Sequence, residues 1–161
     1  STQRMILDMK LSTKGRYAMI ALTDLANPKN DKVSTLSQIS KRQKISLAYL
    51  EQLFVKLRRA GIVSSTRGPG GGYSLSKSAD AIRIADILAA VDETMDALIK
   101  GGGASPAVGC SKEQSLTNRL WEGLSAHVYV YLHQTRLSDV IENQLSPCPA
   151  VPNLLEVVDA A

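Results

Sequence analysis

Two short helical segments joined by a tight turn, and followed directly by a glycine-rich hairpin, constrain the fold of this chain more than any other feature. The first segment can be capped by Ser34 or Thr35 and fades in the polar run 41–44. Ser46 offers a new N-cap shortly afterwards. The second segment then carries one apolar stripe until Gly61, formed by Leu47, Leu50, Leu53, Phe54 and Leu57. This pattern predicts a helix-turn-helix.

The segment after this pair is typical of a β-hairpin. Residues 62–67 are rich in strand-forming side chains, residues 68–72 are almost entirely turn formers, and residues 73–76 alternate again. A helix-turn-helix followed by a hairpin is the winged arrangement, in which the second helix of the pair enters the major groove and the hairpin forms the wing.

Further helices flank this unit. One apolar helical pattern ends at residues 27–28, and another covers residues 82–91. A longer stripe over residues 116–132 spans about five turns, with a short helix near 139–144 and a proline-bounded tail at 151–158. We therefore expect a mainly α-helical fold with a small β-hairpin wing, in which a winged helix-turn-helix domain is followed by a long dimerisation helix.

The sequence predicts four segments. Residues before Met9, a candidate native start, carry little structural signal, and residues 101–109 are rich in Gly, Ala, Ser and Pro without periodicity. The expected segments are an N-terminal extension (1–8), a winged helix-turn-helix domain (9–83), a linking helix with a flexible sensor loop (84–109), and a dimerisation helix with a C-terminal tail (110–161).

Charge is divided unequally between the two halves of the chain. Residues 1–83 contain 15 Lys and Arg against 5 Asp and Glu, a net charge of +10, whereas residues 84–161 contain 4 against 10, a net charge of −6. A basic first half implies an anionic polymer as partner, and nucleic acid is favoured because a basic membrane-surface helix would need a large exposed apolar face. No apolar run approaches the ~18 residues of a membrane span and no signal peptide is evident, so we expect a cytoplasmic protein that binds no membrane.

The outward face of the helix over residues 46–60 is suited to reading DNA. It begins with small or hydrogen-bonding side chains and ends with cations, an order that matches base edges first and phosphates later. Gln52 can address adenine, Glu51 can accept from cytosine, and Val55 could touch a thymine methyl group. The alternative is a merely polar exposed helix whose final cations favour its C-terminus. The residues expected to contact bases are Ser46, Ala48, Tyr49, Glu51, Gln52 and Arg67, and those expected to contact the DNA backbone are Lys14, Lys56 and Arg59.

The segment 67–73 (RGPGGGY) is the most informative short motif. Consecutive glycines, among them Gly70 and Gly71, let the backbone approach a phosphate or groove wall, and Arg67 at the base of the wing can enter a minor groove. The alternatives are a plain hairpin turn and a nucleotide-binding loop. No Lys-Ser or Lys-Thr follows as in a P-loop, and Tyr73 stands where a dinucleotide motif needs its third glycine. We therefore interpret the segment as a wing.

The long apolar stripe in the second half predicts self-association. The remaining chain offers no partner large enough to cover it, so we expect a homodimer whose two recognition helices bind a pseudo-palindromic operator in double-stranded DNA. The alternative is that this helix folds back on its own winged domain.

Neither the histidines nor the cysteines indicate catalysis. His127 and His133 lie on one predicted helix without a nucleophile-base pattern, and they are not three or four residues apart. Cys110 and Cys148 are 38 residues apart without a Cys-x-x-Cys motif, so their spacing alone is a weak signal for a metal. We expect a protein that is not an enzyme.

Three motifs carry a resemblance to a known family: residues 11–18 (LSTKGRYA), 45–54 (ISLAYLEQLF) and 67–73 (RGPGGGY). With them the chain resembles the IscR-type iron-sulfur cluster regulators, a family of winged-helix repressors, from Met9 through residues 116–121 (LTNRLW) and beyond. The resemblance implies a homodimer in which the long helix crosses between subunits. It also implies a [2Fe-2S] cluster in the preceding loop that tunes which promoters are bound, with cluster assembly genes as targets.

The ligand positions depart from that family's pattern of three cysteines and a histidine. Ser115 and Asn118 stand where the last cysteine and the histidine would be, Cys110 falls near the middle cysteine, and nothing supplies the first. Some alphaproteobacterial members share this depleted loop and the tail 146–151 (SPCPAV), which makes Cys148 a candidate replacement ligand. The hypothesis is iron sensing through a [2Fe-2S] cluster with atypical ligands, in which Cys110 or Cys148 acts with non-cysteine partners.

These observations favour a homodimeric DNA-binding transcription regulator, a repressor of iron-sulfur cluster assembly and iron-related genes that responds to iron or cluster status. Two alternatives stay open. One is a winged-helix regulator that senses redox or another signal without a cluster, and the other is a winged helix that binds an acidic protein partner.

Overall fold

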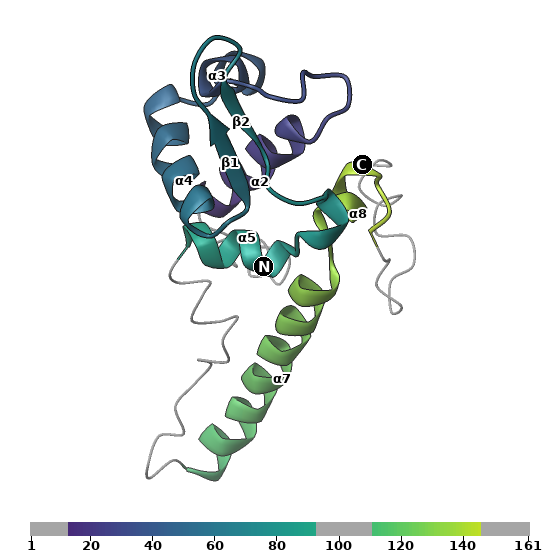
Figure 1. Ribbon diagram of the computed structural model, residues 1–161. Coiled ribbons are helices and arrows are strands. Elements are labelled where there is room, and N and C mark those ends of the chain that lie inside the picture. Colours follow the sequence, from purple (N-terminus) through teal and green to yellow (C-terminus); the bar gives the residue numbers. More distant parts are fainter. Residues whose placement is uncertain (1–12, 93–110, 146–161) are drawn as a thin grey trace, which may run out of the picture.

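The computed structural model describes residues 13–92 and 111–145 of the chain (Figure 1). The N-terminal extension, the expected sensor loop and the proline-bounded tail, with Cys110 and Cys148, lie outside the described residues. The elements, in chain order, are α2 (Thr13–Leu25), α3 (Leu36–Gln43), α4 (Leu47–Arg59), β1 (Val63–Thr66), β2 (Gly72–Leu75), the 3-10 turn η1 (Ala79–Ala81), α5 (Ile84–Val91), α7 (Lys112–Gln134) and α8 (Leu137–Ile141). The predicted class, mainly helical with one hairpin, is confirmed.

Side-chain caps define the turn between α3 and α4. The Thr35 hydroxyl accepts from the Gln38 backbone N–H at 3.2 Å, and the Gln38 side chain accepts from the Thr35 N–H at 2.8 Å, which forms a capping box. α3 ends where Lys44 adopts a left-handed conformation with φ of 59°. Ser46 then caps α4 by accepting from the backbone N–H three residues on. The predicted helix-turn-helix is therefore present, with Thr35 rather than Ser34 as its first cap.

One apolar core joins the helix-turn-helix to α2 and α5. Phe54 and Leu57 of α4 and Leu22 of α2 are completely buried in it. α5 adds five buried residues to the same cluster, so the core continues past residue 83. Burying one such large side chain stabilises a fold by roughly 1.5–3 kcal/mol. The inward face of α4 therefore fixes the direction in which its outward face points.

Leu47 departs from the predicted apolar stripe of α4. Its side chain is 42% exposed, although it shares a helical face with Leu50 and Phe54. Leu47 is the first residue of the helix, and Cα–Cβ bonds tilt toward a helix N-terminus, so its side chain leans past the end of the core. The stripe predicted the correct face but did not show where the core ends.

The wing is fastened to the helix-turn-helix by main-chain hydrogen bonds. β1 and β2 pair antiparallel, with Thr66 opposite Gly72 at the turn. Ser34, just before α3, pairs with Tyr73 as a third strand-like residue, because each N–H donates to the other's carbonyl at 3.0 and 2.7 Å. The Tyr73 ring packs edge-on against Phe54 with ring centroids 4.9 Å apart. The hairpin is thus held in place close to its turn rather than free to swing.

α7 projects away from the winged unit (Figure 1). Its 23 residues correspond to about 34 Å of helix, and none of them is buried. The chain returns to the core at the C-terminal end of α7, where the Ile84 N–H donates to Thr135 O at 3.0 Å and the Leu137 N–H donates to Ile82 O at 2.9 Å. α7 is therefore anchored at one end beside α5 and extends outward from there.

Two helices begin earlier than their apolar patterns predict. α7 begins at Lys112 rather than at the first apolar position because Ser111 and Gln114 form a capping box. α8 covers Leu137–Ile141 rather than residues 139–144, since Asp139 accepts from the Arg136 N–H at 2.8 Å and Leu137 is completely buried. In both cases a polar cap, which apolar periodicity does not reveal, sets the boundary.

Candidate nucleic-acid interface

The outward face of α4 presents most of the predicted DNA-contacting side chains to solvent. Exposure runs along the whole helix, and Lys56 alone among the polar residues of this face is half-buried. Val55 is 37% exposed, which leaves an apolar spot in the middle of the polar face. The exposed predicted residues on this element are Ser46, Ala48, Glu51, Gln52 and Arg59. The structure thus places these side chains together on one rigidly backed surface.

Tyr49, like Lys56, is half-buried, and its ring packs against another element. Its ring meets that of Tyr17 on α2 edge-on, with centroids 5.4 Å apart and planes at 84°. Burial raises the pKa of the Tyr49 hydroxyl, and the neighbouring Tyr17 and Asp92 raise it further. The hydroxyl therefore stays protonated at neutral pH. Tyr49 links the start of α4 to α2 as well as bordering the outward face.

Arg67 lies at the tip of the wing rather than at its base as predicted, because β1 ends at Thr66 and the turn begins there. Its side chain is exposed. Gly68 and Gly70 have φ of 92° and 72°, values that favour glycine. Gly71 has another reason to be glycine: a Cβ there would lie 2.3 Å from the Thr66 carbonyl oxygen. Its N–H donates to Gly68 O at 2.9 Å and closes the turn. The hairpin's own geometry therefore demands several of these glycines, and Gly68 and Gly70 have open space where a Cβ would lie.

A buried charge network that the sequence reasoning missed lies behind α3. The Asp24 side chain is only 2% exposed and accepts hydrogen bonds from Arg42, the shortest at 2.7 Å, and from Gln43 at 2.6 Å. Arg42 also donates to the Ser34 hydroxyl at 3.2 Å. The signal was available, because Asp24 stands beside Leu25 on the otherwise apolar face of α2.

This network decides the charge state of Asp24. Burial raises the pKa of its carboxyl, but the hydrogen bonds from Arg42 and Gln43 and the charge of Arg42 outweigh burial, so the pKa lies below its usual value. Asp24 is thus ionised at neutral pH and ties α2 to α3. Arg42 is engaged inside the protein and is not a free cation for an external anion.

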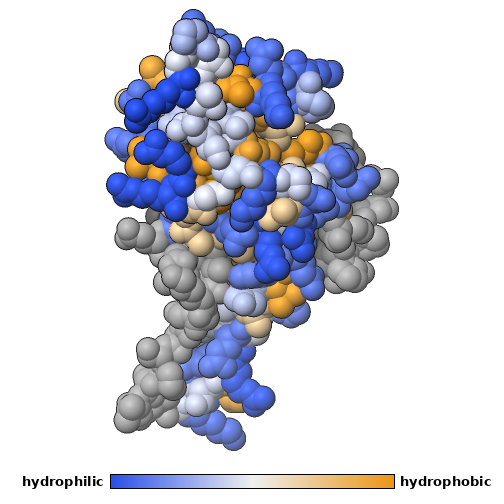
Figure 2. All heavy atoms as spheres, viewed as in Figure 1, coloured by the Kyte–Doolittle hydropathy of each residue, from blue (hydrophilic) through white to orange (hydrophobic). Residues whose placement is uncertain are grey.

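The remaining cations concentrate on the helix-turn-helix. Between residues 36 and 59 the chain has five Lys and Arg besides Arg42 and a single acidic residue, Glu51. Figure 2 shows strongly hydrophilic side chains gathered over the α3 and α4 side of the winged unit. Lys14 adds an exposed cation in the first turn of α2. Such a one-sided basic surface is the electrostatic footprint of a nucleic-acid-binding protein.

The described residues do not supply the family's usual cluster ligands. Ser115 is exposed and Asn118 half-exposed one turn apart near the start of α7, and a hydroxyl and an amide lack the thiolate and imidazole donors that iron-sulfur clusters take. His133 stacks on Tyr129, and its Nδ1 lies 2.8 Å from the Tyr129 carbonyl oxygen. Within residues 13–92 and 111–145 there is no group of three or more His, Cys, Asp or Glu that could hold a metal. In the same ranges no helix is long and apolar enough to cross a membrane.

Comparison with known proteins finds relatives along most of the chain. Residues 11–143 match the Rrf2 family model, which is described as an iron-dependent transcriptional regulator. The chain is 64% identical over 153 residues to the HTH-type transcriptional regulator IscR of Cereibacter sphaeroides, with 94% of this chain and 99% of that one covered. It is 45% identical over 137 residues to the protein of the same name from Erwinia tasmaniensis, with 84% and 81% covered.

Solved structures of similar proteins share the fold. CymR (YrzC), the global cysteine regulator of B. subtilis, matches with a TM-score of 0.68 and 33% identity over 84% of this chain and 98% of that one. T. potens IscR matches with a TM-score of 0.67 and 30% identity over 86% and 90%.

Proposed function

Because this chain belongs to the Rrf2 family of iron-dependent transcriptional regulators, we propose that it is a homodimeric repressor that binds duplex DNA through α4 and the wing. It is a transcription regulator rather than an enzyme. Its targets are genes of iron-sulfur cluster assembly and iron supply, and its signal is iron or cluster status. The observation that carries the DNA-binding part is the exposed outward face of α4, fixed in direction by the buried face behind it.

Contacts to bases come from the first half of α4 and from the wing. Gln52 and Glu51 offer hydrogen-bonding groups to base edges, and the small side chain of Ala48 allows the helix to approach closely. Arg67 enters the minor groove beside the site. Ser46 and Tyr49 complete this set at the start of the helix, with Gly70 and Gly71 bringing the wing backbone close to the DNA.

Contacts to phosphates come from cations at the edges of the interface. Lys56 and Arg59 lie toward the C-terminal end of α4, and Lys14 lies in the first turn of α2. Each phosphate neutralised adds about 0.9 to the slope of log K against log salt. These contacts set register and affinity but carry no sequence information.

Dimerisation through α7 supplies the second recognition helix. The apolar side chains of this helix form a stripe that is open to solvent in the single chain, with Leu116 56%, Leu120 62% and Leu124 45% exposed. A second copy in antiparallel or crossed contact would bury this stripe, which is a strong driving force because apolar burial contributes roughly 25 cal/mol per Å². A two-fold dimer then matches a pseudo-palindromic operator.

Binding of an iron-sulfur cluster by this chain requires ligands other than the family's usual three cysteines and one histidine. Ser115 and Asn118 do not fit a cluster that expects a cysteine and a histidine, so the proposal assigns the thiolate ligand to Cys110 or Cys148 with non-cysteine partners. Because Ser115 and Asn118 replace the usual cysteine and histidine, a second candidate is a regulator that senses redox without a cluster. Anaerobic reconstitution followed by absorption and Mössbauer spectra separates the two. Iron-sulfur bands that disappear in Cys110→Ser or Cys148→Ser support the cluster, and their absence from wild-type protein supports the second candidate.

DNA binding is tested with a duplex selected from a random library by the full-length protein. Fluorescence anisotropy over a series of salt concentrations should give a steep loss of affinity, with a slope of several times 0.9. Replacing Arg67 by Ala should weaken binding to the selected duplex by about 1–3 kcal/mol if its side chain reads a base or a narrow groove, and by less if it touches only phosphate. Failure to enrich any sequence would contradict the proposal.

A further inference from the structure

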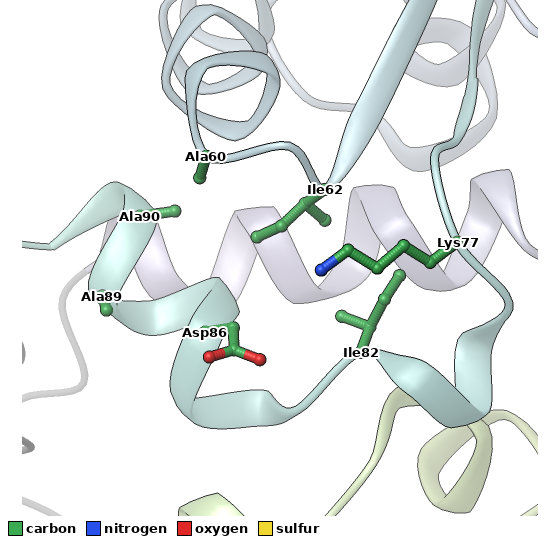
Figure 3. Close-up of a pocket in the computed structure, with 7 residues that line it drawn as sticks. All are labelled: Ala60, Ile62, Lys77, Ile82, Asp86, Ala89 and Ala90. Atoms are coloured by element: carbon green, nitrogen blue, oxygen red, sulfur yellow. The ribbon is translucent and has the colours of Figure 1, made fainter.

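A hollow of about 440 Å³ opens where the end of α4, the base of the wing and α5 meet (Figure 3). Ile62 and Ile82 line it with apolar side chains that are themselves almost fully buried, at 2% and 1% exposure. Three alanines, at positions 60, 89 and 90, add small methyl groups to its walls. The volume lies in the range of small-molecule sites, roughly 300–1,000 Å³.

Two opposite charges face this hollow from different elements. Lys77 follows the wing and extends its amine to a point between Ile62 and Ile82, whereas Asp86 presents its carboxylate from the first turn of α5 (Figure 3). The two side chains form no ion pair with each other, and Lys77 has no hydrogen-bond or ion-pair partner within the described part of the chain. Asp86 accepts only a long hydrogen bond, of 3.4 Å, from the Arg83 N–H. Both charges are therefore available to a ligand.

We propose that this hollow binds a free amino acid with an apolar side chain. The carboxylate of the ligand would pair with Lys77, its ammonium group with Asp86, and its side chain would lie against the alanines at positions 60, 89 and 90, of which the first is exposed and the other two are half-buried. A simple anion would be repelled by Asp86 and a simple cation by Lys77, whereas a zwitterion can pair with both charges. The methyl groups of the three alanines favour a ligand that brings its own apolar group.

This site is independent of the proposed DNA interface. It shares no residue with the outward face of α4, the wing tip or the candidate cluster ligands. A ligand in it would bridge the wing base and α5, two of the elements that pack against the recognition helix, and would stabilise their present arrangement by mass action. The amino acid is thus a second input beyond the iron signal.

The test is a titration of ¹⁵N-labelled full-length protein with L-leucine, followed by NMR. We expect saturating shifts in the amides of residues 60–62, 77 and 82–90, with one ligand bound per chain. N-acetyl-L-leucine lacks the ammonium charge and L-leucinamide lacks the carboxylate, so each should bind about 10-fold more weakly or worse. Shifts that do not saturate, or that are equal for all three compounds, would overturn the proposal.

Two exposed-site variants assign the charges. Lys77→Met should abolish the preference for L-leucine over L-leucinamide, and Asp86→Asn should abolish the preference over N-acetyl-L-leucine. Asparagine keeps an oxygen that can still cap α5, so the fold is expected to survive. Lys112→Met, an exposed lysine at the start of α7, is the matched control and should leave both preferences intact. Preferences unchanged in Lys77→Met and Asp86→Asn would contradict the assignment.

Discussion

Asp24 shows how one residue can organise a binding surface that it does not touch. Its buried carboxylate holds Arg42 and Gln43 of α3 against α2 and, through Arg42, reaches Ser34. Ser34 in turn pairs with Tyr73 of the wing. One ionised side chain thus connects α2, the helix-turn-helix and the wing, and fixes where the neighbouring cations stand.

Replacing Asp24 by Asn should destabilise the protein by about 1–3 kcal/mol at pH 7. The cost stays moderate because the Arg42 side chain is 33% exposed and can be rehydrated. The pKa of Asp24 is lowered in the folded state, so its contribution is complete above its unfolded pKa of about 3.9 and is lost as pH falls through the folded value. Urea unfolding at pH 7 and below pH 4 measures this. The exposed Glu142→Gln is the control, and an Asp24→Asn deficit that does not shrink in acid would contradict the account.

Gly72 is the residue on which wing attachment depends most directly. A Cβ there would lie 2.6 Å from the Ser34 carbonyl oxygen, at a φ of 150°. Gly72→Ala should therefore separate the wing from the helix-turn-helix and cost about 1–3 kcal/mol of stability. Thermal unfolding and DNA affinity should both fall, whereas Ser65→Ala on the exposed side of β1 should change neither. A stable Gly72→Ala protein with normal DNA affinity would show that the attachment is dispensable.

At the residue scale, the sequence predicted the caps of α3 and α4 and most of the outward face of α4, but not the reasons for every glycine. The motif 67–73 was interpreted through approach to DNA, whereas Gly71 and Gly72 are required by carbonyl groups of the protein itself. The exposure of Leu47 and the packing of Tyr49 on Tyr17 also escaped prediction. Each of these features depends on the position of an element that is distant in the chain, and local periodicity carries no information about that position.

At the scale of elements, α7 is the helix whose surface is least explained by the single chain. Its apolar positions 116, 120, 124 and 131 recur on one side at helical spacing, and all four are exposed. The sequence predicted this stripe and its length well, because periodicity over many turns is the strongest local signal. The beginning of α7 was missed, since its capping box lies before the first apolar residue.

A charge on the apolar side of α7 should disrupt the proposed dimer. Leu120→Glu places a carboxylate in the stripe and should convert the protein to a monomer, because an unpaired charge in an apolar interface is costly. Ala126→Glu adds the same charge on the opposite side of the helix, where the residue is exposed, and should leave the dimer intact. Light scattering after size-exclusion chromatography measures the mass. Equal masses for both variants would count against dimerisation through this stripe.

At the scale of the whole molecule, one basic winged unit is joined at its core to a helix that leaves it (Figure 1). α5 and the residues after α7 share that core, since Leu137 is completely buried in it. A change in the proposed dimer contact along α7 would therefore be transmitted to the winged unit, which carries the recognition helix α4. The sequence predicted the winged unit and the long helix, but not the contact between them. That contact pairs residues 82–84 with residues 135–137, which are distant in the chain.

The central claim is that the outward face of α4 reads a DNA sequence, and the ratio of affinities for a selected and a scrambled duplex tests it most directly. The wild-type protein should bind the selected duplex roughly 10³-fold more tightly or better. Gln52→Ala should lower that ratio by about 10-fold, whereas Gln134→Ala, an exposed glutamine at the C-terminal end of α7, should leave it unchanged. Equal affinity of the wild-type protein for both duplexes, or a ratio that Gln52→Ala does not alter, would contradict the account.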